Sequence, residues 1–168
     1  IQYGMERIVD DNTQLVVIGT GEQRYEDMFR YYAYRYPNKV SANILYSDDL
    51  AHKLYAAADA FLMPSLFEPC GLTQIIAFRY GTVPIVRETG GLKDTVEPLN
   101  EFEDTGDGFS FTNYNGDDMV NVINYSKYIF FEQRKIWNNM VKRGMKKDLS
   151  WGVSKKRYEE IYNTLIGR

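Results

Sequence analysis

The stretch ADAFLMPSLFEPCGLTQ, residues 58–74, passes from an apolar run through a polar turn to the start of a second apolar run. Residues 60–63 are apolar but too few for a typical helix, and Pro64 ends the run. The second apolar pattern extends over residues 72–80. We therefore predict a strand, a loop and a helix, in that order.

The polar turn between this strand and this helix is a candidate ligand site. In an open parallel α/β sheet, ligands bind at the carboxyl ends of the strands, and the first turn of the next helix offers unpaired N–H groups to an anion. The residues that we expect at this edge are Glu68, Cys70, Gly71, Leu72 and Thr73.

Strand and helix patterns alternate on both sides of this stretch. We expect strands at residues 15–18, 39–46, 59–65, 82–86 and 108–111, and helices at about 1–10, 22–36, 50–57, 70–80, 119–131, 133–147 and 154–166. This alternation predicts a doubly wound parallel sheet flanked by helices, with right-handed crossovers. Residues 15–18 are expected to form a buried strand, and residues 97–108 a surface loop.

The composition excludes several classes of protein. A chain of 168 residues is one domain's worth of sequence. Its net charge of −3 gives no reason to expect nucleic acid or an anionic membrane as partner.

The single cysteine excludes an intrachain disulfide, which fits a reducing cytoplasm. No run approaches the roughly 20 apolar residues that span a bilayer. The basic residues at 142–157 are best explained as a solvated helix surface.

Other predicted strands also end in residues suited to a ligand. Gly19-Thr20-Gly21 follows the first strand and is either a tight turn or a loop that lets a nucleotide approach the backbone. Tyr46 lies at the carboxyl end of the second strand, where its ring could contact a ligand or cover the core. Thr89-Gly90-Gly91 follows the fourth strand and is either a simple turn or part of the same site.

Three segments together resemble the carboxyl-terminal half of bacterial glycogen synthases and plant starch synthases. They are FEPCGLTQ at 67–74, RYGTVPIV at 79–86 and TGGLKDTV at 89–96. The resemblance implies a Rossmann-like domain of a two-domain GT-B glycosyltransferase that lacks its first strand. Residues 1–168 would be one donor-binding domain, with a helical tail from about 117 to 168 that packs toward an amino-terminal domain.

The resemblance also implies an activity. The family transfers glucose from ADP-glucose to the non-reducing end of an α-1,4-glucan such as glycogen, with retention, and releases ADP without a metal or other cofactor. The expected partners are therefore ADP-glucose, the glucan and the amino-terminal domain of the same chain. The family's phosphate-binding arginine and lysine and its catalytic-cleft histidine precede the part matched here, so we expect this chain alone to be inactive.

Residue roles follow from the same resemblance. Glu68 would orient the glucosyl ring as the catalytic residue, with Cys70 and Gly71 beside the sugar. The remaining assignments are Gly71, Leu72 and Thr73 to the diphosphate, Gly19, Thr20, Gly21 and Tyr46 to the nucleotide, and Thr89, Gly90 and Gly91 to a nearby loop.

Several alternatives remain open at this point. Many related transferases place a second glutamate eight residues after the first, where this chain has Ile76; this disfavours a UDP- or GDP-sugar transferase of another branch without excluding it. Nothing in the sequence forbids a third interpretation, a non-catalytic nucleotide-binding module. A cysteine hydrolase would need Cys70 paired with the only histidine, His52.

The sequence contains no histidine and carboxylate spacing typical of a metal site. Its acidic pairs, Asp48-Asp49 and Asp117-Asp118, are better explained as helix caps.

Overall fold

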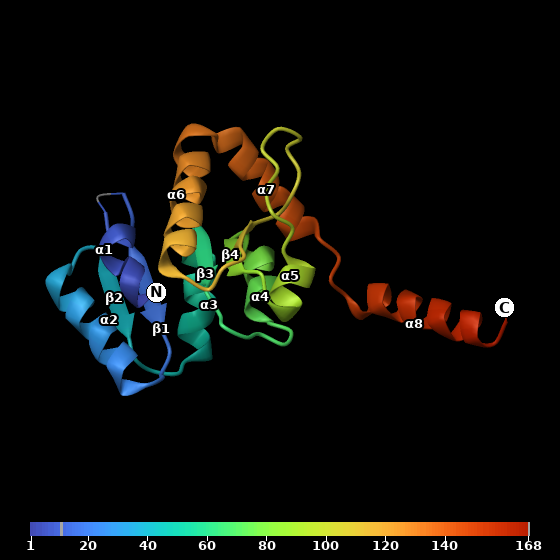
Figure 1. Ribbon diagram of the computed structural model, residues 1–168, viewed down its shortest axis with the longest axis horizontal. Coiled ribbons are helices and arrows are strands. Elements are labelled where there is room, and N and C mark those ends of the chain that lie inside the picture. Colours follow the sequence, from blue (N-terminus) through green and yellow to red (C-terminus); the bar gives the residue numbers. More distant parts are fainter. Residues whose placement is uncertain (11, 168) are drawn as a thin grey trace.

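A computed structural model of the chain describes residues 1–10 and 12–167, which hold five strands and the helices around them (Figure 1). In chain order the elements are η1 (Gln2–Gly4), α1 (Met5–Ile8), β1 (Leu15–Ile18), α2 (Gln23–Arg35), β2 (Val40–Asn43), α3 (Asp48–Ala57), β3 (Ala60–Met63), α4 (Thr73–Tyr80), β4 (Val83–Arg87), α5 (Gly90–Thr95), β5 (Phe109–Phe111), α6 (Gly116–Glu132), α7 (Arg134–Lys146) and α8 (Trp151–Leu165).

All strand pairs are parallel, as the alternation of strands and helices predicts. β1 pairs with β2, with Leu15 opposite Val40. β4 lies between β3 and β5, with Ile85 opposite both Leu62 and Phe109. The five predicted strands and the predicted helices are therefore confirmed, with shifted ends.

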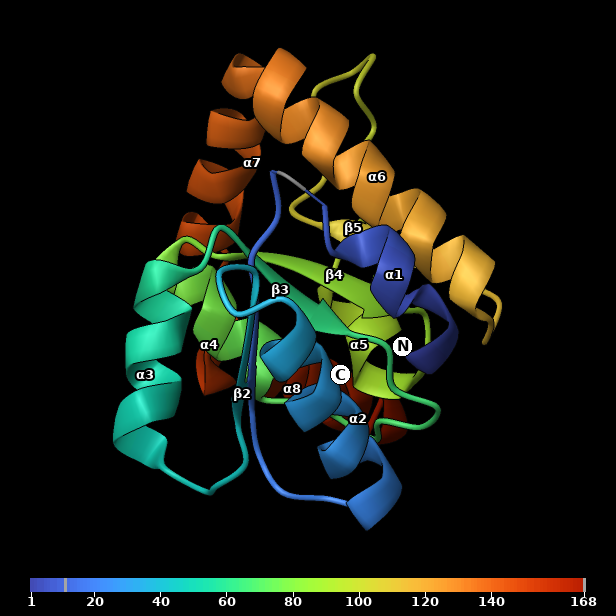
Figure 2. The same cartoon turned by 90° about the vertical axis from the view of Figure 1, so that its left-hand side faces the viewer.

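Helices cover both faces of the three-stranded sheet. Because side chains of a strand alternate between its faces, those of β4 enter two separate cores. Val83 and Ile85 pack in a core that contains Met119 of α6 and Trp137 of α7. Val86 packs in the other core, which α4 and α5 supply. Figure 2 shows α6 and α7 above this sheet and α4 and α5 below it.

The predicted parallel α/β fold is confirmed, and its strands form a two-stranded and a three-stranded sheet. β1 and β3 line a cavity of about 920 Å³ between the two sheets. The expectation that residues 15–18 are buried is wrong: these residues are half-exposed, and Val16 is 46% exposed. The physical reason is that one edge of β1 has no neighbouring strand in the described part of the chain.

Several element ends differ from the predictions. β2 stops at Asn43, so residues 44–46 of the predicted strand at 39–46 lie beyond its end. The segment 88–92, predicted as a loop, contains the start of α5 at Gly90.

The residues that cap α3 and α6 are Ser47 and Asn115. Ser47 Oγ accepts from the N–H of Leu50, and Asn115 Oδ1 accepts from the N–H of Asp118. The acidic pairs at 48–49 and 117–118 therefore lie in the first turns, where negative charge is favourable, instead of at the caps.

The segment 97–108 is tied to α7 more firmly than a surface loop would be. Asp107 is buried and pairs with Lys147, while Arg143 Nη1 lies 3.0 Å from Asp104 Oδ1. The hydrogen bond from Asn139 to Asp104, followed by that from Arg143, lowers the pKa of Asp104. α6 and α7 thus belong to the packed body, whereas α8 projects away from it (Figure 1).

Of the helices in residues 1–10 and 12–167, none has the length and apolar character needed to cross a membrane.

Candidate functional site

The predicted site residues lie after the strands, in two groups. Gly19, Tyr46 and Thr73 line the cavity between the two sheets. The second group consists of the β3–α4 loop, with Glu68, and the amino-terminal end of α5. The carboxyl ends of β1, β2, β3 and β4 therefore supply all the candidate residues, as expected for an α/β ligand edge.

The loop after β1 has an open backbone. Gly19 has a φ of +141°, which L side chains rarely adopt, and its N–H donates to the carbonyl of Asn43 on β2. Gly21 donates its N–H to Glu26 Oε1 at 3.0 Å. A Cβ added at either glycine would meet no atom within 4 Å, so a ligand could approach this backbone closely.

Tyr46 stands at the ligand side of β2 and is 82% exposed. Its hydroxyl donates to Asp48 Oδ1 at 2.9 Å, and this hydrogen bond raises the pKa of the Tyr46 phenol. The bond restrains the ring from its far end and leaves its faces to solvent. Tyr46 therefore does not cover the core, which was one of the two explanations that the sequence left open.

The β3–α4 loop and α5 touch backbone to backbone. The N–H of Gly91 donates to the carbonyl of Pro69 at 3.3 Å. A Cβ at Gly90 would lie 2.0 Å from the Glu68 carbonyl oxygen, and one at Gly91 would lie 2.0 Å from that of Cys70. Only residues without a side chain let α5 lie this close to the β3–α4 loop. Gly90 and Gly91 are therefore needed for the contact between the two segments and do not merely form a turn.

The backbone at the start of α4 has a conformation suited to binding an anion. Gly71 has a φ of +71°, and Leu72 follows with φ −102° and ψ −25°. A left-handed residue followed by a right-handed one turns successive N–H groups toward one side, an arrangement that binds anions. No side chain caps α4, and Thr73 directs its hydroxyl to Met63 Sδ. Any contact of this segment with a phosphate would therefore come from the backbone.

Glu68 lies in the same loop, three residues before Gly71. Its side chain is half-buried, and its carboxylate has no hydrogen bond or ion pair within residues 1–10 and 12–167. Cys70 is exposed and free. His52 Nδ1 lies 2.9 Å from the Tyr80 hydroxyl, and no contact with Cys70 is present in the described residues. The structure thus does not bring the thiol and the imidazole of a cysteine hydrolase together.

Sequence reasoning missed two residues that brace this loop. Gln74 is fully buried and donates to the carbonyls of Cys70 and Gly71. Arg87, the last residue of β4, donates to the carbonyls of Ser65 and Leu66. An amide inside the apolar pattern 72–80 was the one available signal for Gln74.

The described residues contain no group of three or more His, Cys, Asp or Glu side chains that could hold a metal ion.

Parallel strands with helices on both faces define a Rossmann-like class of domain. Residues 5–143 match the family described as glycosyl transferases group 1, and the chain belongs to this family.

Among curated relatives, the glycogen synthase of Lachnospira eligens is 59% identical over 165 residues, or 98% of this chain and 34% of that protein. The glycogen synthase of Lachnoclostridium phytofermentans is 57% identical over 161 residues, or 96% of this chain and 34% of that protein. The chain thus spans about a third of the length of the curated relatives that it matches.

Solved structures share the fold. The catalytic domain of starch synthase IV from Arabidopsis thaliana, bound to ADP and acarbose, has a TM-score of 0.72 and 27% identity, with 99% of this chain and 42% of that one covered. Anabaena Alr3699/HepE in complex with UDP-glucose has a TM-score of 0.66 at 19% identity, with 96% and 44% covered, and shows the fold alone. The fold is that of GT-B glycosyltransferases.

Proposed function

We propose that this chain is the donor-binding part of a retaining glucosyltransferase that transfers glucose from ADP-glucose to the non-reducing end of glycogen or a similar α-1,4-glucan. Relatives named glycogen synthase, more than 50% identical over nearly the whole chain, support this. So does the likeness to a starch synthase structure bound to ADP. A further part of the longer protein would supply the acceptor side and the remaining cations, so we expect the isolated chain to transfer no sugar.

The observation that carries the proposal is that one loop, β3–α4, holds Glu68 and, three and four residues later, the left-handed and right-handed turn of Gly71 and Leu72. In sugar transfer, positive charge develops at the anomeric carbon while the diphosphate leaves with growing negative charge. Backbone N–H groups at a helix start stabilise the departing phosphates, and the positive end of the helix dipole adds to this. Glu68 would hold the hydroxyls of the sugar, without a resident metal.

The other predicted residues complete the proposed donor site. Tyr46 would stack on adenine, and the open Gly19-Thr20-Gly21 backbone would border the nucleotide. Cys70 would line the sugar pocket beside Gly71, and the loop at 89–91 would hold the Glu68 loop in place. We also propose a cytoplasmic location, which the single free cysteine favours.

The test is a titration of the isotope-labelled 168-residue chain with ADP and, separately, with UDP, followed by backbone amide NMR shifts. We expect ADP to shift the amides of Gly19, Tyr46, Gly71 and Thr73, and UDP to shift them much less. Equal shifts with both nucleotides would contradict the ADP assignment and favour a UDP-sugar transferase. The absence of shifts with either nucleotide would contradict the proposed donor site.

Elongation of glycogen by the purified chain would contradict the proposal that another part of the protein is needed.

A further inference from the structure

We propose that Gln74 is a positioning residue that turns the N–H groups of Gly71 and Leu72 outward, toward the diphosphate of the donor. The identity of the diphosphate rests on the proposed function. The orientation of the N–H groups is a property of the free chain and can be tested without any ligand.

The orientation follows from the two carbonyls that Gln74 holds. Its Nε2 donates to the carbonyl oxygen of Cys70 at 3.2 Å and to that of Gly71 at 2.8 Å. In a trans peptide the carbonyl of one residue and the N–H of the next point in opposite directions. Because both carbonyls point inward at Gln74, the N–H groups of Gly71 and Leu72 point away from it.

The packing of the Gln74 side chain against Gly71 fixes the same orientation of the loop backbone. Gln74 is 0% exposed, and its amide fills the space in which a Gly71 side chain would lie. A Cβ at Gly71 would be 2.5 Å from Gln74 Oε1, and Gly71 has the positive φ of +71° that favours glycine. The loop therefore closes around this particular side chain.

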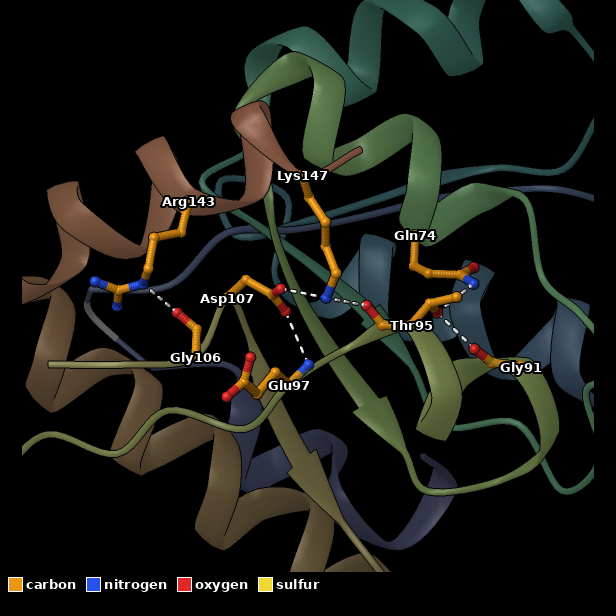
Figure 3. A network of polar contacts seen from close by, with 8 residues as sticks. All are labelled: Gln74, Gly91, Thr95, Glu97, Gly106, Asp107, Arg143 and Lys147. Carbon is orange, nitrogen blue, oxygen red and sulfur yellow. Dashed lines mark hydrogen bonds and ion pairs between the residues drawn. The ribbon is translucent and has the colours of Figure 1, made fainter. Parts of the chain in front are cut away.

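The same Nε2 has a third acceptor, which joins α4 to α5, so its two hydrogens are shared among three oxygens (Figure 3). Gln74 Nε2 lies 3.0 Å from Thr95 Oγ1, and this hydroxyl donates to the Gly91 carbonyl at 2.5 Å. Lys147 Nζ donates to the Thr95 carbonyl at 2.7 Å, which ties α5 to the end of α7. Gln74 is thus also anchored to α5.

Packing alone does not explain an amide at this position. Gln74 Oε1 is buried and has no hydrogen-bond partner among the described residues, and such an unpaired oxygen lowers stability. Methionine has nearly the same size and would avoid this cost, but it donates no hydrogen bond. A neutral donor that reaches two carbonyls at once is what the loop requires.

The first arm of the test compares the free chain with its Gln74→Met variant by residual dipolar couplings of the backbone N–H groups. We expect the couplings of Gly71 and Leu72 to change and those of β4 and β5 to stay the same. The matched control is Gln23→Met, which makes the same change at an exposed position of α2. Unchanged couplings at Gly71 and Leu72 would overturn the inference, whatever the chain binds.

The second arm measures ligand affinity. Gln74→Met should weaken ADP about 10-fold, the equivalent of one lost hydrogen bond to a charged group, while adenosine binding stays unchanged. An equal loss for both ligands would indicate general disruption and overturn the positioning role. If the original chain binds no ADP while the couplings change as expected, the proposed function fails and the positioning role stands.

If Gln74→Met does not fold, the Gln74→Glu variant tests the positioning role by the same N–H couplings. The protonated carboxyl can donate one hydrogen bond, whereas the ionised carboxylate donates none. We expect the Gly71 and Leu72 couplings of this variant to approach those of the original chain at acidic pH and to depart from them at neutral pH. Couplings that do not change with pH would overturn the inference.

Discussion

Glu68 is the residue on which the proposed sugar chemistry depends. Its side chain is half-buried in the loop that leads to Gly71 and Leu72, and its carboxylate has no partner in residues 1–10 and 12–167. A carboxylate can accept two hydrogen bonds from sugar hydroxyls. It would be repelled by a diphosphate, so its attractive contact should be with the sugar alone.

We predict that Glu68→Ala lowers the affinity of the chain for ADP-glucose about tenfold relative to ADP, because charge-assisted hydrogen bonds to the sugar are lost. Parallel NMR titrations with the two ligands measure this ratio. Glu132→Ala, at the exposed end of α6, is the matched control and should change neither affinity. An equal weakening of ADP and ADP-glucose by Glu68→Ala would contradict the sugar-binding role.

The contact between the β3–α4 loop and α5 joins two elements that the sequence separates by a helix and a strand. It depends on the absence of side chains at Gly90 and Gly91, whose backbone lies against the carbonyls of Glu68 and Cys70. Because Gln74 and Thr95 bridge the same two elements, the loop and the helix should behave as one unit.

We predict that Gly91→Ala lowers the free energy of unfolding by about 1–3 kcal/mol, since a Cβ 2.0 Å from the Cys70 carbonyl oxygen forces the loop and α5 apart. Urea denaturation followed by circular dichroism measures the change. The control is Gly21→Ala, where the added Cβ meets no atom within 4 Å. A stability loss no larger than that of the control would show that the two elements are free to separate.

The arrangement of the two sheets leaves β1 and β3 facing each other across the cavity of about 920 Å³. Unpaired strand edges with apolar side chains favour pairing with another chain. Val16 is 46% exposed on β1, so this edge combines an accessible backbone with an apolar surface. The chain as a molecule should therefore self-associate through this region.

We predict concentration-dependent association of the chain in sedimentation velocity experiments, and a marked reduction of it by Val16→Lys. A charge on a strand edge opposes pairing with a second strand. Tyr34→Lys, on the exposed surface of α2, introduces the same charge away from the cavity and should leave the association unchanged. Equal reduction by both variants would indicate an effect of net charge instead of the strand edge.

The order of strands and helices and the position of the ligand edge could be read from the sequence, because both follow from local patterns. The run at 60–63, Pro64 and the polar turn after it predicted β3, its loop and α4. Such signals involve residues close together in the chain. They also predicted which residues would follow the strands, including Tyr46 and Glu68.

Contacts between distant segments were decided by the folded chain. The division into two sheets, the approach of Gly91 to Cys70 and the three hydrogen bonds of Gln74 depend on how the elements pack. The sequence around a buried glutamine is the same whether its amide only fills space or donates hydrogen bonds that position a loop. Only the positions of its partners in space distinguish these roles, since hydrogen bonds require specific distances and directions.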